Sequence, residues 1–166
     1  MTIETAFKEA IYNSLQGFLY SNAVFLAERL YAACANPENL HLLGTCYYRS
    51  GLPKRAIGLL KDNIRTEATR YLLAVCYYEI GQFAEAETAL LADARLGEPG
   101  DVPNGAQGLH LLGMIARYTR YTIWLCCLTL RSKGGRTARA IQYFRKALEL
   151  DPFLWTSFEE LCDLGT

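Results

Sequence analysis

The 166-residue chain carries 17 basic and 17 acidic residues, and 51% of its residues are apolar. Because the charges cancel, no overall field attracts nucleic acid or an anionic membrane, and we expect neither partner. The N-terminus has no basic segment followed by an apolar run and a cleavage site, so it shows no secretory signal and we expect an intracellular protein. The apolar content suffices for one domain with a continuous core.

The first predicted unit, residues 4–36, is the most divergent part of the chain's internal repeat. We assign it by counting back from Pro37, which opens the next unit. Its first helix is expected to run from about Ile3 to Phe18. Its second helix places small and large residues one turn apart, so that a neighbouring helix can approach closely. These residues are Ala23, Ala27 and Leu30.

The next two units, residues 37–66 and 67–92, are related by an offset of thirty residues. Residues 40–60 aligned on 70–90 give eight identities in 21 positions. In each copy the first helix carries a large, a small and an aromatic residue on one face, and a glycine ends it. The second helix carries a small and a large residue four apart. The positions are Leu43, Gly44, Tyr47, Ala56 and Leu60, and then Leu73, Ala74, Tyr77, Ala86 and Leu90.

The fourth unit, residues 106–152, follows a stretch over 93–105 that is rich in Gly, Pro and Asp and predicts an exposed loop. Leu109–Gly113 repeats Leu40–Gly44 letter for letter. Ala140, Phe144, Ala147 and Pro152 then reproduce the second-helix spacing and a terminal proline. Residues 153–163 predict an amphipathic capping helix, as expected for the end of a repeat array.

This alternation of small and large residues with periodic glycine resembles the tetratricopeptide repeat, whose hairpins run about 34 residues. The resemblance implies an all-α fold with almost no strand. We therefore predict a tetratricopeptide-repeat solenoid of about four helical hairpins plus a C-terminal capping helix, forming a single domain over residues 1–166.

Residues 120–134 interrupt the fourth unit, because their removal would leave a hairpin of normal length. Their apolar part, Ile123–Leu130, is far shorter than the ~20 residues that cross a bilayer. Three interpretations stay open. The segment is an extra helix that continues the first helix of the unit, a docking patch away from any membrane, or translated intron sequence from a gene prediction.

The residues give little support for catalysis or for a cofactor. The histidines, His41 and His110, occupy equivalent positions of two repeats, so repetition explains them without a metal or an acid–base pair. Cys46 and Cys76 share one register inside apolar helices, where cysteine acts as a small hydrophobic residue. No cysteine or histidine spacing matches a zinc site. We expect no enzyme, no cofactor, no metal and no small-molecule substrate.

A stack of hairpins leaves a concave face that the first helices line. The residues expected there lie one turn apart and off the packing face, and tyrosine predominates, which suits a surface that binds proteins. The expected occupant is a helix that binds by its apolar face. The predicted protein-interaction groove comprises Tyr12, Leu15, His41, Tyr48, Arg49, Tyr71, Tyr78, His110, Arg117 and Tyr118.

Three segments carry a more specific resemblance, namely Asn22–Tyr31, Thr45–Gly51 and, above all, Asp151–Cys162 with its Pro-Phe-Leu-Trp and Phe-Glu-x-Leu-Cys. They look like the N-terminal tetratricopeptide domain of subunit three of the anaphase-promoting complex, or cyclosome. The similarity runs from about Ala10 to Gly165. The chain departs from that family by its 120–134 segment and by stopping at Thr166, where family members continue into a second repeat array.

The resemblance implies a scaffold role in a multisubunit ubiquitin ligase of the cell cycle, in the nucleus and cytoplasm. In the family, two copies pair by inserting their first helices into each other's groove, and coactivator tails bind the C-terminal array. We therefore expect a homodimer that also contacts other subunits of the complex. An isologous pairing of this kind needs one surface that serves as donor and receiver. The predicted donor helix carries Phe7, Ile11, Leu15 and Phe18.

The alternative function is an adaptor, similar to a cochaperone, that binds a helical or C-terminal peptide of another protein. To hold a C-terminal carboxylate, such a groove would want Lys, Asn and Arg in successive layers. Only Arg49 and Arg117 fall at those positions. The residues therefore favour pairing over the capture of a carboxylate.

Overall fold

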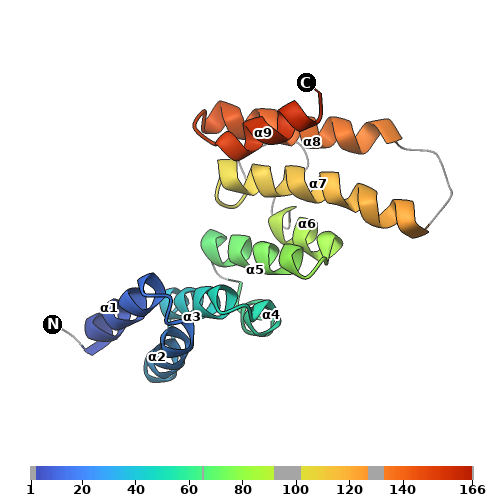
Figure 1. The fold of residues 1–166 in the computed structure, drawn as a ribbon. Coiled ribbons are helices and arrows are strands. Elements are labelled where there is room, and N and C mark those ends of the chain that lie inside the picture. The colour runs from blue at the N-terminus through green and yellow to red at the C-terminus, as the bar shows by residue number, and fades with distance from the viewer. Residues whose placement is uncertain (1–2, 65, 92–101, 127–132, 166) are drawn as a thin grey trace. The chain divides into compact units, whose positions relative to one another are not determined.

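The computed structural model describes residues 3–64, 66–91, 102–126 and 133–165. Within these ranges it contains nine helices and no strand, which confirms the predicted all-α class (Figure 1). The chain divides into two compact units, Met1–Ile80 and Gly81–Thr166. Each unit is built from successive helices that pack on their neighbours in the sequence.

The first unit consists of antiparallel helices joined by short connections. Contacts run from each helix to the next, and α3 also contacts α5 directly. The helices are α1 (Ile3–Gln16), α2 (Tyr20–Ala33), α3 (Pro37–Arg49), α4 (Pro53–Leu60) and α5 (Glu67–Glu79).

Close approach between these helices depends on small side chains. A methyl group added at Gly44 of α3 would lie 3.0 Å from Leu60 of α4 and 3.2 Å from Leu72 of α5. Ala23 of α2 is fully buried in the core cluster of this unit. The small residues of the repeat therefore let helices approach, as the sequence predicts.

Local capping explains where the repeated helices begin and end. The Asn36 side chain accepts a hydrogen bond of 2.7 Å from the backbone N–H of Asn39 at the start of α3. The hydroxyl of Thr66 does the same for α5. The turns after α3 and α5 contain Gly51 and Gly81, with φ angles of 71° and 77°. Glycine reaches this left-handed region without steric penalty, so these turns are unstrained.

The second unit is dominated by one long hairpin. It consists of α6 (Phe83–Leu91), α7 (Ala106–Cys126), α8 (Lys133–Leu150) and α9 (Trp155–Asp163). The helices α7 and α8 have 21 and 18 residues, whereas α3 and α4 have 13 and 8. Phe144 of α8 is fully buried and packs on α7 at Gly113.

The interrupting segment 120–134 lengthens this hairpin. The helix α7 continues into it as far as Cys126, and α8 begins inside it at Lys133 (Figure 1). Residues 127–132 lie outside the described ranges. Of the three interpretations, the structure contains the continuing helix. The origin of the segment in the gene stays a prediction.

The predicted exposed loop over 93–105 falls mostly outside the described residues, and its last part is not exposed. Val102 is 6% exposed and Pro103 is buried below 2%. The reason is Gly108 on α7, where a methyl group would lie 2.1 Å from the carbonyl oxygen of Pro103. The absence of a side chain there lets the chain lie flat against the helix, so the prediction of exposure was wrong for these two residues.

Replacing Gly113 with alanine tests the close contact in the long hairpin. The added methyl group would lie 2.4 Å from Cε1 of Phe144, so we expect the Gly113→Ala protein to lose about 1–3 kcal/mol of unfolding free energy. Gly58 is the matched control, because it is helical and has open space around it. Gly58→Ala should stabilise by about 0.4–1 kcal/mol. Urea denaturation measures both, and equal effects of the two substitutions would contradict the packing described.

Candidate protein-interaction surface

The apolar face of α1 that we predicted as a donor is buried in its own unit. Ile11 is 0% exposed, and Phe7 and Leu15 pack against the same cluster, which α2 and α3 complete. This face is therefore part of the core in this structure and is not a free surface. Spacing alone did not distinguish the two roles, because a core face and a docking face of a helix have the same periodicity.

Phe18 differs from the other three predicted donor residues. The helix α1 ends at Gln16, two residues before the predicted end, and Phe18 lies in the turn that follows. Its side chain is 76% exposed, and its φ angle of 58° is in the left-handed region. A non-glycine residue is strained there, because its Cβ approaches the backbone.

The first hairpin exposes several large apolar side chains around this turn. Tyr12 of α1 is 53% exposed, Leu19 is 61% exposed, and Phe25 of α2 is 52% exposed. The ring of Phe18 meets that of Tyr20 edge to face at 6.3 Å. The sequence reasoning missed Leu19 and Phe25. The signal for Phe25 was present, because it lies between the small contact residues Ala23 and Ala27 and so points away from the packed face.

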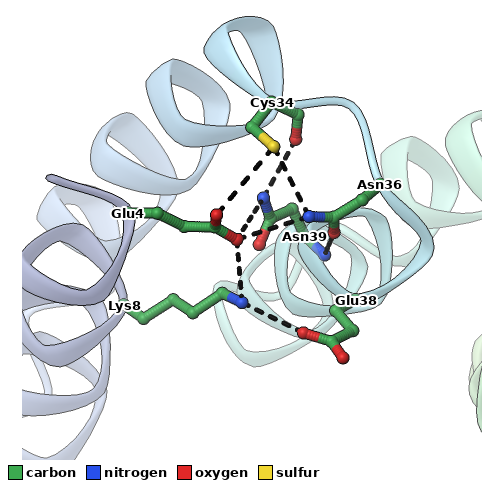
Figure 2. A network of polar contacts seen from close by, with 6 residues as sticks. All are labelled: Glu4, Lys8, Cys34, Asn36, Glu38 and Asn39. Carbon is green, nitrogen blue, oxygen red and sulfur yellow. Dashed lines mark hydrogen bonds and ion pairs between the residues drawn. The ribbon is translucent and has the colours of Figure 1, made fainter. Parts of the chain in front are cut away.

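Polar contacts hold the start of α1 to the connection between α2 and α3. The carboxylate of Glu4 accepts hydrogen bonds of 3.3 Å each from the side-chain amides of Asn36 and Asn39 (Figure 2). The thiol of Cys34 lies 4.0 Å from the other carboxylate oxygen. Asn39 is 1% exposed, so its amide needs a partner and receives one from a different helix.

Lys8 extends this network along α1. Its ammonium group lies 3.0 Å from the carboxylate of Glu4 and 3.0 Å from that of Glu38 at the start of α3 (Figure 2). The hydrogen bond from Lys8, followed by those from Asn39 and Asn36, lowers the pKa of Glu4. We call this group of residues the Glu4 network: Glu4, Lys8, Cys34, Asn36, Glu38 and Asn39.

The lowered pKa of Glu4 predicts how acid affects the first unit. A carboxyl whose pKa falls on folding stabilises the folded state above its ordinary pKa, near 4.5, and this stabilisation is lost as the pH falls through the lowered value. We expect Glu4→Gln to lower the urea midpoint at pH 7 and to show a smaller further loss on acidification than the unchanged protein. Glu9→Gln, on the exposed side of the same helix, is the control. Parallel acid titrations of Glu4→Gln and the unchanged protein would disprove this role.

The predicted groove residues of the third and fifth helices do come together. Tyr48, Arg49, Gly51 and Pro53 line an open hollow of roughly 450 Å³ with Glu79. Burial, and then the charge of Glu79, raises the pKa of Tyr48. This hollow is where the first unit offers a mixed aromatic and charged surface.

The neighbouring groove positions are half-buried. Burial, and then the proximity of Tyr48, raises the pKa of Tyr71. Burial lowers the pKa of His41. Tyr78 is half-buried, whereas Tyr12 and Leu15 lie on α1, Tyr12 exposed and Leu15 packed on the core. The structure therefore groups Tyr48, Arg49 and Tyr71 with Glu79 as a candidate receiver surface.

In the second unit the predicted groove positions are occupied by the chain's own side chains. His110 lies 2.8 Å from the hydroxyl of Ser157 on α9, and Tyr118 stacks on Phe83 with ring centroids 6.3 Å apart. Arg117 pairs with Glu160 and, at 3.4 Å, with Asp163. We had predicted His110 and Arg117 as open groove residues, but they serve to hold α9.

Removing Arg117 tests this interpretation. Glu160 is largely buried beside it, so its carboxylate would lose a charged partner. We expect Arg117→Ala to cost about 1–3 kcal/mol of stability and to reduce the hydrogen-exchange protection of α9. Arg145→Ala on the exposed side of α8 is the control. Unchanged exchange in α9 would show that the ion pair does not hold this helix.

The thiols of the repeat are structural. Cys46 and Cys76 are free and buried, and burial raises the pKa of their thiols to about 11 and about 12. Within the described ranges, no group of three or more His, Cys, Asp or Glu is arranged to bind a metal ion. The helices in those ranges also lack the length and apolar character needed to cross a membrane.

Comparison with known families identifies the repeats. A family model described as "Anaphase-promoting complex, cyclosome, subunit 3" matches residues 16–92, and a tetratricopeptide-repeat model matches residues 129–153. Cell division cycle protein 27 homolog B of Arabidopsis thaliana is 37% identical over 164 residues, which is 98% of this chain and 20% of the relative. The human cell division cycle protein 27 homolog is 38% identical over 166 residues, which is 94% of this chain and 18% of the relative.

Solved structures agree on the fold. The Cut9–Hcn1 hetero-tetramer of the complex superposes with a TM-score of 0.77 at 22% identity, covering 97% of this chain and 29% of that one. The Cdc27 N-terminus superposes with a TM-score of 0.70 at 20% identity, covering 93% of this chain and 64% of that one. The chain is a tetratricopeptide-repeat protein. Within that class it belongs to the family of subunit 3 of the anaphase-promoting complex, and it spans about a fifth of the length of its curated relatives.

Proposed function

We propose that this chain is a non-catalytic scaffold and homodimerisation module of the anaphase-promoting complex, acting in the nucleus and cytoplasm. Its relatives are cell division cycle protein 27 homologs, and one solved neighbour is an assembly of the complex itself. The observation that carries the pairing is the set of exposed apolar residues on the first hairpin: Tyr12, Phe18, Leu19 and Phe25.

These residues need a partner because of the area that they expose. Each is more than half exposed, and they belong to one hairpin of a unit whose small residues are otherwise well packed. Several large apolar side chains exposed on one hairpin support an interaction site there. A second copy satisfies the need without another partner, because each copy supplies the same surface.

A scaffold role is supported by how the chain uses its reactive side chains. His110 contacts a fully buried Ser157, and burial lowers the pKa of both described histidines. His110 therefore serves packing between helices. We expect other subunits of the complex to contact exposed surfaces such as the hollow at Tyr48 and Arg49.

That hollow also supports the alternative function, an adaptor that binds a helical or C-terminal peptide of another protein. The two functions differ in the state of the isolated chain. An adaptor is a monomer until its peptide arrives, whereas a homodimerisation module pairs by itself.

Sedimentation of the 166-residue chain tests the pairing. The chain has a mass of 18.7 kDa, and we expect twice that mass at micromolar concentrations, with dissociation on dilution. Phe153 provides a control, because it is 94% exposed in the second unit and outside the proposed surface. Phe153→Ser should leave the dimer intact. A single 18.7 kDa species at all concentrations would contradict the proposal and favour the adaptor.

A further inference from the structure

The turn between α3 and α4 is strongly basic. Residues 39–61 contain four Lys or Arg and no Asp or Glu. Three of these four, Arg49, Lys54 and Arg55, flank the turn, and all three are exposed. Among the residues that the structure describes, none of the three takes part in an ion pair. We call the segment from Arg49 to Arg55 the basic turn.

The charge of the basic turn is unfavourable for α4 itself. The N-cap residue of this helix, Leu52, makes no side-chain hydrogen bond, and the first turn contains no acidic residue. Lys54 and Arg55 lie in that turn, at the positive end of the helix dipole, where anions are stabilising and cations are not. The position equivalent to Arg55 in the next repeat is Glu85, in the first turn of α6. The basic turn thus departs from the repeat in a way that lowers the stability of α4.

The basic turn borders the hollow already described. Tyr48, Arg49, Gly51 and Pro53 line this space of roughly 450 Å³ together with Glu79. Pro53 is the first residue of α4, so the positive end of the helix dipole lies at the edge of the hollow. Tyr48 is half-buried and adds an aromatic wall with a polar tip. Positive charge and aromatic surface therefore meet at one open site.

Charge complementarity favours a short acidic peptide as the occupant of this site. The positive charge comes from three side chains of one hairpin, which suits a few carboxylates. Glu79 on the rim would repel a continuous phosphate backbone, whereas a peptide can place an amide there. A clamp for a C-terminal carboxylate uses charges from successive layers, and here a single layer supplies them. Carboxylates within a segment, and not a chain end, fit this arrangement.

We propose that the hollow and the basic turn bind an acidic segment of another protein. Its Asp or Glu side chains pair with Arg49, Lys54 and Arg55, and an apolar side chain packs against Tyr48. The inference rests on the proposed scaffold role and names the chemistry of one partner. Bound carboxylates offset the positive charge at the start of α4, so binding stabilises a helix that its own first turn destabilises.

Replacing Arg55 with glutamate separates binding from folding. The substitution introduces the residue type that the next repeat has at this position. We expect Arg55→Glu to raise the Tm of the free chain, because glutamate suits the positive end of the helix dipole. It should also raise the Kd for an acidic peptide by roughly tenfold or more. Arg145→Glu is the matched control, because it makes the same change of charge at an exposed position of α8. Its Kd should stay within about threefold of the unchanged chain.

Fluorescence anisotropy of the 166-residue chain measures these Kd values. The probe is a short fluorescein-labelled peptide of alternating Glu and Phe, amidated at its C-terminus. An equal Kd for the same peptide with Gln in place of Glu would overturn the role of charge. Equal affinity for a single-stranded oligonucleotide would overturn the peptide as occupant. An Arg55→Glu chain that folds and keeps its Kd would overturn the site.

Sedimentation of the same samples distinguishes this inference from the homodimer. A dimer that does not bind the acidic peptide would overturn the inference alone. A monomer that binds the peptide, and loses it on Arg55→Glu, would support the inference and contradict the homodimer.

Discussion

The packing of small residues against large ones at each helix crossing is the constraint on which the rest of the structure depends. Because Gly44 has no side chain, Leu60 and Leu72 pack closely against it, and Phe144 packs against Gly113 in the same way. A close crossing brings a second helix near enough to bury its apolar face completely, so successive hairpins form a core without any strand. The same close packing includes α1. Its Ile11 packs in the same cluster as Ala23 and is 0% exposed.

The burial of Ile11 changes how the function can be carried out. A helix whose apolar face forms part of the core contributes to stability and cannot at the same time bind a partner by that face. The residues that remain exposed on the first hairpin include Tyr12 before the turn at Phe18 and Phe25 after it. Stability and pairing thus compete at α1.

Much of the fold was predictable because the same helical-hairpin pattern recurs along the sequence. The identities between residues 40–60 and 70–90 revealed the hairpins, and the positions of Gly51 and Gly81 gave the helix ends. These signals are local, since a helix face and its cap are encoded within a few residues. The family followed from the more specific segment Asp151–Cys162, and the comparisons confirm it.

The surfaces were less predictable, because they depend on contacts between residues far apart in the sequence. Glu4 meets Asn36 and Asn39 only after the first helix folds back on the next connection. Position in the repeat suggested that Arg117 lines a groove, yet the terminal helix α9 packs over it and supplies Glu160. Repeat periodicity gives the direction of a side chain. It does not say whether another helix or solvent will meet it.

A zero-length cross-link between Lys8 and Glu38 tests the central claim most directly. Their charged groups lie 3.0 Å apart, so a carbodiimide can join them as an amide. The dimer would be formed from a mixture of ¹⁵N-labelled and unlabelled chains, isolated, cross-linked, digested and analysed by mass spectrometry. Packing of α1 on its own unit predicts cross-linked peptides in which Lys8 and Glu38 carry the same label. Cross-linked peptides that carry different labels would show that α1 packs on the partner copy and would contradict the account.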